Sequence, residues 1–218
     1  MHRTLKILFF LLIVRPIALV VLGLNVVHRQ RLPRQGPAVI AANHNSHLDT
    51  MVLMSLYPLS TIHKLRPVAA ADYFLANRLL AWFSLNVIGI IPLKRTGRVS
   101  REELFSGCHR ALDKGDILIL FPEGSRGEPE QTSKPKRGLY YLVNEREDTL
   151  ITPVMMHGLG RALPRGEALL VPFNCDVVVG EPLTATDSSE QLVGLLSEAF
   201  AELKQQCLTC NTATDEAK

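Results

Sequence analysis

The sequence predicts an α/β domain with a mixed, mostly parallel central sheet flanked by helices, preceded by an N-terminal membrane-anchoring helical segment. Three observations support this prediction. Short apolar runs alternate with longer amphipathic stretches after Gly36-Pro37, as strands and helices do in α/β domains. The residues before that point are apolar and basic. Hydrophobic residues make up 47% of the 218-residue chain and charged residues 21%, which is typical of a folded domain with its own core.

The first 35 residues form the expected membrane-associated segment. Its apolar runs Ile7–Val14 and Ile17–Leu24 are separated only by Arg15-Pro16. One helix over Ile7–Val27 would be about 30 Å long, enough to cross a bilayer. However, a central arginine costs about 2.5–3.5 kcal/mol on the insertion scale, and a proline favours a kink. We therefore favour two short helical pieces lying in one leaflet, with Arg15 reaching the headgroups, over a spanning helix.

A cleaved signal peptide is disfavoured, because the apolar stretch is too long and no small-x-small site precedes the basic flank. The net charge of +3 also hides an asymmetry, since the first acidic residue is Asp49. Basic residues beside aliphatic ones favour an anionic membrane surface as the partner. Nucleic acid is disfavoured, because stacking aromatics are not interleaved with the basic residues. Four scattered cysteines are too few for a disulfide scaffold and indicate a reducing compartment.

Residues 36–210 form the expected domain, and residues 211–218 a flexible tail. Apolar runs predict strands at Val39–Ala42, Pro67–Ala70, Ile90–Leu93, Ile117–Phe121, Thr152–Met156 and Asp176–Val179. Amphipathic stretches predict helices at Leu48–Tyr57, Leu79–Leu85, Arg101–Lys114, Leu139–Asn144 and Ser189–Cys207. The Pro-, Gly- and Lys-rich stretch Gly127–Arg137 predicts an exposed loop.

A histidine and a carboxylate five residues apart are the first candidates for chemistry. His44 follows the strand Val39–Ala42, and Asp49 falls in the first turn of the next predicted helix, where the helix dipole favours a carboxylate. From the preceding loop, His44 can fold back over that turn. A carboxylate that accepts a hydrogen bond from one ring nitrogen leaves the other nitrogen as a base.

Two other interpretations of this motif are weaker. Ser125 is a candidate nucleophile, but Glu123 occupies the first glycine position of the Gly-x-Ser-x-Gly elbow. The hydroxyl that His44 deprotonates is then expected to belong to the substrate. A metal site at His44, His47 and Asp49 lacks the His-Glu-x-x-His spacing and a further ligand. His47 is better explained as a structural or lining residue.

Cationic side chains at three predicted strand ends indicate an anionic substrate group. Arg126 follows the strand Ile117–Phe121, Arg95 follows Ile90–Leu93, and Lys136 lies further along the chain. Ligand sites in α/β sheets form at the carboxyl ends of strands. A guanidinium can bind a phosphate in a bidentate manner, and a glycine such as Gly124 lets backbone N–H groups approach it.

Taken together, these motifs resemble those of the glycerolipid acyltransferases, and most closely the bacterial 1-acyl-glycerol-3-phosphate acyltransferases. The resemblance covers roughly Ala38 to Val154, in four ordered blocks: Asn43-His44-x4-Asp49, Ile91–Arg95, Phe121-Pro-Glu-Gly-Ser-Arg-Gly127 and Ile151-Thr-Pro-Val154.

This resemblance implies roles for seven residues. His44 would be the general base and Asp49 the residue that orients it. Arg95 would help to hold the phosphate of the acceptor, and Lys136 would face the same phosphate. The remaining residues, Glu123, Gly124 and Arg126, would shape and bind the acceptor site.

The implied reaction moves a fatty acyl group from acyl-CoA or acyl carrier protein to lysophosphatidic acid or a related lysolipid, without a metal or other cofactor. We expect it at the cytoplasmic face of a bacterial inner membrane. Glycerol-3-phosphate or a lyso-aminolipid is an alternative acceptor. A membrane-bound esterase or thioesterase and an inactive lipid-binding module are alternative functions. The stretch Leu79–Leu85 could line the acyl slot or meet the bilayer, but a core helix is the favoured interpretation.

Overall fold

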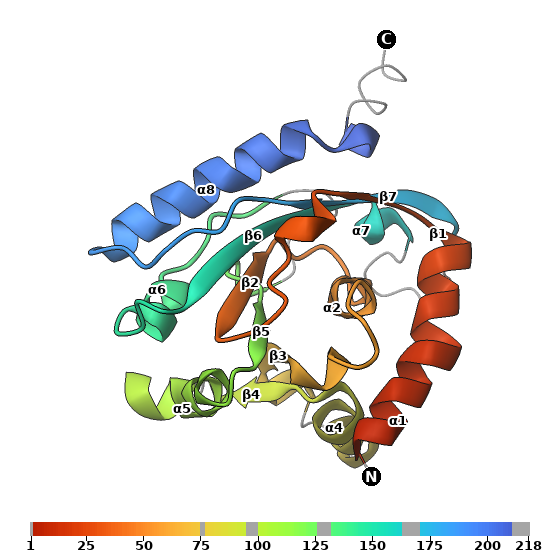
Figure 1. The fold of residues 1–218 in the computed structure, drawn as a ribbon, viewed down its shortest axis with the longest axis horizontal. Coiled ribbons are helices and arrows are strands. Elements are labelled where there is room, and N and C mark those ends of the chain that lie inside the picture. The colour runs from red at the N-terminus through yellow and green to blue at the C-terminus, as the bar shows by residue number, and fades with distance from the viewer. Residues whose placement is uncertain (1, 75–76, 95–99, 126–131, 163–170, 211–218) are drawn as a thin grey trace.

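The computed structural model describes residues 2–74, 77–94, 100–125, 132–162 and 171–210. Within these ranges seven strands form one sheet, in the order β1-β7-β6-β2-β5-β3-β4 (Figure 1). Their bounds are β1 Leu22–Val27, β2 Ala38–Ala42, β3 Leu65–Ala70, β4 Ile91–Leu93, β5 Ile117–Leu120, β6 Leu150–His157 and β7 Phe173–Val179.

The sheet is mixed and mostly parallel, as predicted. Strand β2 pairs in parallel with both β5 and β6, and β3 pairs in parallel with β5 and β4. Among the described pairs of named strands, only β6–β7 is antiparallel, while β1 runs parallel to β7. All five residues of β2 are buried, because helices cover both faces of the sheet at this position.

Two apolar cores lie on opposite faces of the sheet. Helix α2 (Leu48–Ser55) and the N-terminal helix pack on one face, and the sheet curves around α2 (Figure 1). Helices α5 (Arg101–Asp113), α6 (Gly138–Val143) and α8 (Ser189–Gln205) cover the other face. Alternate residues of β2 serve the two cores, as the two-residue period of a strand requires. The short helices are α3 (Ala71–Phe74), α4 (Arg78–Phe83) and α7 (Leu159–Ala162).

The N-terminal segment differs from the two kinked pieces that we predicted. Helix α1 (His2–Phe9) continues through the π-helical stretches η1 (Phe10–Val14) and η2 (Ile17–Val21), so that Arg3–Val21 is one apolar helix. The wider turns on either side of Pro16 accommodate a residue that lacks a backbone N–H. Arg15 does not extend outward to headgroups. Its guanidinium donates a hydrogen bond to the backbone carbonyl of Tyr57, 2.8 Å away.

The helical prediction is also too long at its C-terminal end. The helix ends at Val21, and Leu22–Val27 forms the edge strand β1, paired with β7 over six residues. Part of the segment that we assigned to the membrane therefore belongs to the sheet. The helix is joined to the domain by β1 at its end and by the Arg15 contact along its length.

Candidate active site

The site begins in the loop that joins β2 to α2, at the carboxyl edge of the sheet. Asp49 lies in the first turn of α2, as predicted, and is fully buried. One carboxylate oxygen, Oδ2, accepts hydrogen bonds from the backbone N–H groups of Asn45 (2.7 Å) and Ser46 (2.8 Å). These bonds and the N-terminal end of the helix stabilise a carboxylate away from water.

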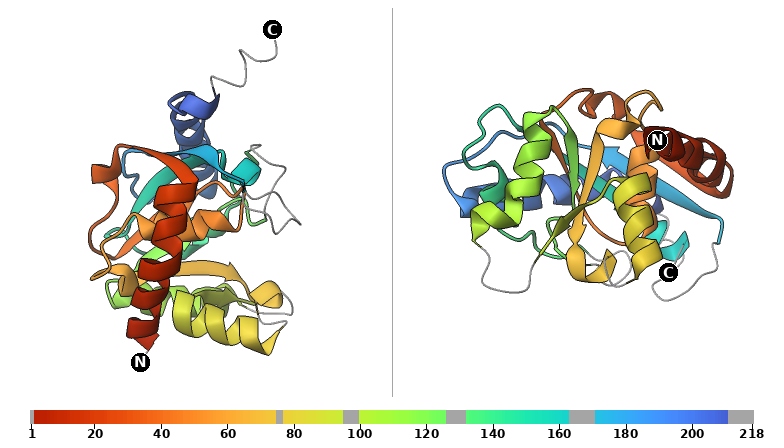
Figure 2. Two further views of the ribbon diagram at one scale, coloured as in Figure 1. Left: turned by 90° about the vertical axis from the view of Figure 1, so that its right-hand side faces the viewer. Right: turned by 90° about the horizontal axis from the view of Figure 1, so that it is seen from below.

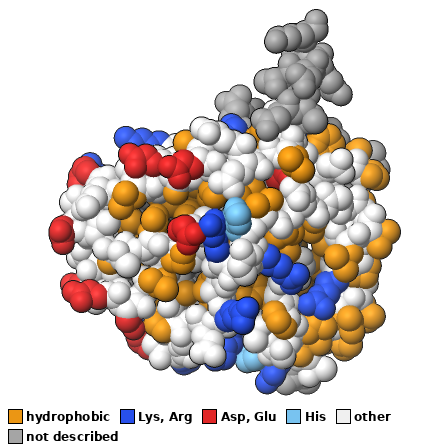
Figure 3. All heavy atoms as spheres, turned by 45° about the horizontal axis from the view of Figure 1, so that its top comes forward, with side chains coloured by type: hydrophobic (Ala, Val, Ile, Leu, Met, Phe, Trp, Pro, Cys, Tyr) orange, Lys and Arg blue, Asp and Glu red, His pale blue; other side chains and the backbone are white. Residues whose placement is uncertain are grey.

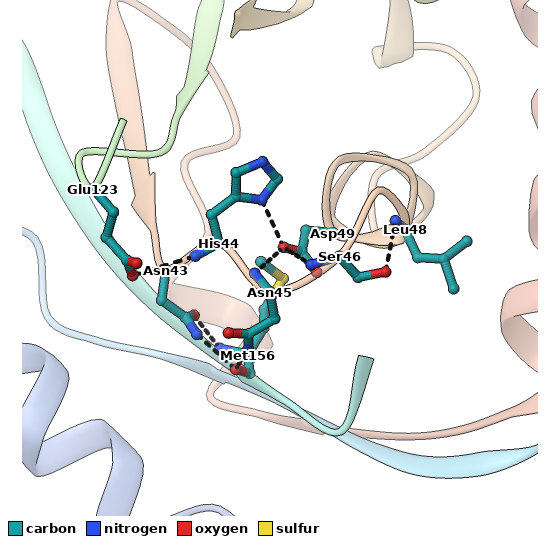
Figure 4. A network of polar contacts seen from close by, with 8 residues as sticks. All are labelled: Asn43, His44, Asn45, Ser46, Leu48, Asp49, Glu123 and Met156. Carbon is teal, nitrogen blue, oxygen red and sulfur yellow. Dashed lines mark hydrogen bonds and ion pairs between the residues drawn. The ribbon is translucent and has the colours of Figure 1, made fainter. Parts of the chain in front are cut away.

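His44 folds back over this turn, as the spacing predicted. Its Nδ1 lies 2.9 Å from Oδ2 of Asp49. The buried carboxylate is an acceptor, so Nδ1 carries the proton and Nε2, which is turned away from Asp49, has a lone pair (Figure 4). The imidazole also stacks on Phe121, with ring centroids 4.1 Å apart. Two contacts therefore fix the orientation of a ring that can act as a base.

Glu123 lies beside this pair, although it follows a different strand. It comes after β5, and its Oε1 accepts a hydrogen bond from the backbone N–H of His44 at 3.3 Å. Burial raises the pKa of the Glu123 carboxyl, and the backbone N–H groups of Ser133 and His44 act in the opposite direction. The contact joins the β2 and β5 strand ends, as Figure 4 shows.

Gly124 and Lys136 also meet at this edge. Gly124 has φ +78°, in the left-handed region that glycine tolerates. A Cβ atom at this position would lie 3.1 Å from Nζ of Lys136, so the lysine side chain lies across the glycine. The backbone N–H of Lys136 holds this segment by donating to the carbonyl of Pro122 at 2.8 Å. The other two predicted cations, Arg95 and Arg126, lie outside the described residues.

An apolar cavity of about 400 Å³ opens at the histidine. His44, Gly124 and Ser125 contribute to its lining, together with apolar residues of α2, β3, α4, the π-helical stretch η5 (Ser84–Ile88) and the two ends of β4. Helix α4 has no buried residue, which corrects the core-helix interpretation of Leu79–Leu85. Its inner side lines the cavity through Leu80 and Phe83, and its outer side is exposed at Leu79 (81%).

Sequence reasoning missed three residues that build this site. Asn43 and Asn45 both bind the backbone of Met156 at the end of β6, with donor–acceptor distances from 2.6 to 2.9 Å. These bonds fix the loop on both sides of His44 (Figure 4). Phe121 supplies the stacking partner of the imidazole. Two asparagines flanking the histidine are the one signal in the sequence that could have identified the loop anchor.

The metal interpretation receives no added support from the geometry. Nδ1 of His44 is occupied by its bond to Asp49. His47 is exposed and contributes to the lining of the cavity. Among the described residues, no group of three or more His, Cys, Asp or Glu side chains is arranged as a set of metal ligands.

A histidine that is oriented as a base at the mouth of an apolar cavity is suited to activating a hydroxyl for acyl transfer. The fold and the site thus define an acyltransferase of the α/β class. The chain belongs to the acyltransferase family, whose model, described as "Acyltransferase", matches residues 23–157. This range begins within β1, in agreement with the place of that strand in the sheet.

Individual relatives carry a more specific name. The chain is 27% identical over 162 residues to a chloroplastic 1-acyl-sn-glycerol-3-phosphate acyltransferase of Arabidopsis thaliana, covering 73% of this chain and 43% of that protein. A protein of the same name from Helicobacter pylori is 24% identical, with coverage of 56% and 48%. The chain thus spans less than half the length of either relative.

A solved structure has a similar fold. The crystal structure of a 1-acyl-sn-glycerophosphate acyltransferase from Thermotoga maritima superimposes with a TM-score of 0.70. The alignment covers 93% of this chain and 79% of that one, at 15% sequence identity. This similarity confirms the predicted α/β fold with a mostly parallel sheet.

Proposed function

We propose that the protein transfers a fatty acyl group from an acyl thioester to the free hydroxyl of lysophosphatidic acid, which gives phosphatidic acid. The observation that carries this proposal is the His44–Asp49 pair at the mouth of the apolar cavity. The names of the relatives in Arabidopsis and Helicobacter favour this acceptor over other lysolipids. The donor is either acyl-CoA or acyl carrier protein, and the chemistry is the same for both.

The reaction follows from the roles of the two side chains. Nε2 of His44 removes the proton of the acceptor hydroxyl as its oxygen attacks the thioester carbonyl. Asp49 stabilises the imidazolium that forms. The tetrahedral intermediate then collapses, its carbon–sulfur bond breaks, and the leaving thiolate takes the proton from the imidazolium. The products are an ester and a free thiol. No acyl group is attached to the protein at any step.

The acceptor is held by its phosphate in this proposal. Lys136 supplies a positive charge beside Gly124, because its side chain lies across that glycine. Arg95 and Arg126 would complete the phosphate site, as the resemblance to the family implies. Glu123 shapes the same site by holding the backbone of His44 in place.

The acyl chain occupies the cavity that begins at His44. Its lining is largely aliphatic and aromatic, so that burial of each methylene of the chain contributes about 0.8 kcal/mol. The proposed thioester carbonyl then lies near the imidazole, while the hydrocarbon extends between β3 and η5. Binding of the chain holds the reacting carbon in place next to the base.

The protein binds the membrane through an apolar membrane surface, which we define as the exposed sides of the N-terminal helix and α4. The N-terminal helix contacts η5, which continues α4, and its Phe9 packs on Phe83 at the end of α4 (Figures 1 and 2). The most exposed members of this surface are Leu12 (66%), Leu19 (75%), Val20 (83%) and Leu79 (81%). Hydrophobic side chains gather on the side of the molecule where the N-terminal helix lies, with Lys and Arg side chains beside them (Figure 3).

The contacts of this helix with the domain favour a monotopic arrangement over a spanning one. Arg15 binds the backbone of the domain, and the helix continues directly into an edge strand of the sheet. A helix held in this way can lie in one leaflet with the catalytic domain against the surface. The cytoplasmic face of a bacterial inner membrane, which supplies both acyl thioesters and lysolipids, fits this arrangement.

A mass-spectrometric screen tests the proposed function. The purified protein is offered acyl-CoA and acyl carrier protein donors against lysophosphatidic acid, glycerol-3-phosphate, lyso-aminolipids and water alone. We expect phosphatidic acid as the main product. Free fatty acid formed at the same rate without an acceptor would identify an esterase or thioesterase instead. A different acylated lipid as the main product would identify a different acceptor.

A further inference from the structure

A buried lysine in the N-terminal helix has no part in the chemistry described above. Lys6 is only 5% exposed, and its Nζ donates hydrogen bonds to the backbone carbonyls of Leu65 (3.0 Å) and Ile88 (2.8 Å). Burial, reinforced by the charge of Arg66, lowers the pKa of Lys6 to about 7, while Asp116 acts in the opposite direction. Burying an amine is unfavourable unless it is hydrogen-bonded, and the two carbonyls meet this requirement.

One of these carbonyls belongs to the wall of the acyl cavity. Ile88 is the last residue of η5 and is followed by Gly89 at φ +80°. The carbonyls at the end of a helical turn lack partners within the helix, and a lysine commonly caps them. Ser84, Ile88 and Ile90 all line the cavity. Lys6 therefore binds this wall from its outer side.

A second contact reaches the same wall one turn further along the helix. The ring of Phe9 packs edge-to-face on Phe83, with centroids 5.0 Å apart and an interplanar angle of 83°. Phe83 in turn lines the cavity. Residues three apart lie on one face of a helix, so Lys6 and Phe9 share the face directed at the domain. Leu8 (45% exposed) and Leu12 (66%) belong to the apolar membrane surface of the same helix.

We propose that Lys6 and Phe9 are positioning residues that hold the outer wall of the acyl cavity, so that the N-terminal helix determines which acyl chain lengths the cavity accepts. The proposal rests on the proposed function, because it takes the cavity as the site of the acyl chain. The helix then has two separate roles on two faces. Its outer face meets lipid, and its inner face supports Phe83 and the turn that ends at Ile88.

The experiment compares chain-length preference in full-length variants. Phe9→Ala, Lys6→Met and the control Leu12→Ala are assayed with myristoyl-, palmitoyl- and stearoyl-CoA and lysophosphatidic acid in vesicles. Phe9→Ala leaves room behind Phe83, and we expect the stearoyl-to-myristoyl ratio of kcat/KM to rise by about tenfold. Lys6→Met keeps the side-chain volume but releases the Ile88 turn, so it should shift the ratio in the same direction. Leu12→Ala should keep the wild-type ratio, even where it weakens vesicle binding.

Uniform loss of activity would overturn the proposal. If Phe9→Ala and Lys6→Met lower kcat/KM by one factor for all three donors, the residues only stabilise the fold. Phe9→Leu, a milder change, should give an intermediate shift in a protein that melts near the wild-type temperature. If Lys6→Met does not fold, the chain-length preferences of Phe9→Ala and Phe9→Leu test the proposal without it.

A second measurement separates this proposal from the proposed function. Calorimetry of myristic, palmitic and stearic acid binding to the same variants does not depend on turnover. A shift in binding preference together with absent acyl transfer would leave the positioning role intact and refute the reaction. Normal transfer by the wild type with an unchanged preference in the variants would refute only the positioning role.

Discussion

His44 and Asp49 meet through a single carboxylate oxygen, because Oδ2 accepts from Nδ1 of the imidazole at 2.9 Å and also from two backbone N–H groups. The same atom therefore orients the base and closes the turn that carries it. Asp49 is fully buried, whereas the side chain of His44 is 20% exposed, toward the cavity. A change at Asp49 should act on the chemistry through the tautomer and orientation of the ring.

Replacing Asp49 by asparagine should lower turnover by about 10⁴-fold, as in other enzymes that lose the carboxylate behind a catalytic histidine. An amide oxygen in the place of Oδ2 can still accept the hydrogen bonds from Asn45, Ser46 and the imidazole, but it lacks the negative charge that stabilises the imidazolium. His44→Ala should abolish acyl transfer. Single-turnover assays on folded protein measure both effects, with vesicle binding unchanged. Turnover of Asp49→Asn at the wild-type rate would contradict the assigned pair.

Ser125→Ala tests whether the acyl group passes through a covalent intermediate on the protein. Ser125 lines the cavity and is exposed, so it is the serine best placed to compete as a nucleophile. If the substrate supplies the hydroxyl, this variant should transfer acyl groups at close to the wild-type rate. Intact-mass spectrometry during turnover should show no acylated protein. An acyl adduct on the wild-type protein that is absent from Ser125→Ala would show a two-step mechanism through an acyl-serine, and would contradict direct transfer.

The raised pKa of Glu123 predicts a pH dependence of stability. Between its ordinary pKa of 4.5 and the raised value, the folded protein keeps a proton that the unfolded chain has lost. The free energy of unfolding therefore falls as pH rises through this window, by at most about 1.4 kcal/mol per pH unit. Above the window the buried carboxylate is ionised and destabilising. Glu123→Gln should remove this decline.

Urea denaturation at a series of pH values measures this effect. The stability of Glu123→Gln relative to wild type should increase as pH rises through the window and then remain constant. Glu198→Gln, on the exposed side of α8, is the control and should follow the wild type at every pH. A constant difference between Glu123→Gln and wild type would show that the carboxyl has an ordinary pKa in the folded protein.

The local parts of the site were predictable from the sequence, because only four residues separate His44 from Asp49 and a helix start fixes their geometry. The six predicted strands are present because buried parallel strands are continuous apolar runs. Ser100 caps α5 by accepting a hydrogen bond from the backbone N–H of Glu103 at 3.2 Å, and a serine three residues before a glutamate is a local sequence signal for a helix start. The contact of Glu123 with His44 was not itself predicted, but it agrees with the rule that the carboxyl ends of parallel strands share an edge of the sheet.

The remaining features depend on contacts that are distant in sequence. Leu22–Val27 continues the apolar run of the helix, and only its pairing with β7 makes it a strand. Pro16 suggested a break, but π-helical turns accommodated it. The period of Leu79–Leu85 identified an amphipathic helix without showing that its inner side faces a cavity. Neither the cavity nor the Lys6 contacts had a signal in the local pattern.

Lys136→Met should weaken use of the phosphorylated acceptor. The side chain crosses Gly124 at the edge of the cavity, and loss of one charged contact of about 1.4 kcal/mol corresponds to a tenfold rise in the KM for lysophosphatidic acid. Monoacylglycerol, which lacks the phosphate, should be used equally well by the variant and the wild type. Lys134→Met is the matched control, because Lys134 is also exposed but lines a different groove beside α8. Equal losses with both acceptors would refute the phosphate role.

Charge placed on the outer side of α4 should impair membrane binding without damaging the site. Leu79 is 81% exposed and Trp82 48%, and each forms part of the apolar membrane surface. Burial of such side chains contributes about 1.5–3 kcal/mol each, so Leu79→Glu should weaken binding to anionic vesicles by at least about tenfold. Co-sedimentation measures this loss, and Leu195→Glu on α8, 37% exposed, should bind normally. Acyl transfer in detergent micelles should survive in Leu79→Glu. Unchanged vesicle binding would leave the N-terminal helix as the sole membrane contact and exclude α4 from the surface.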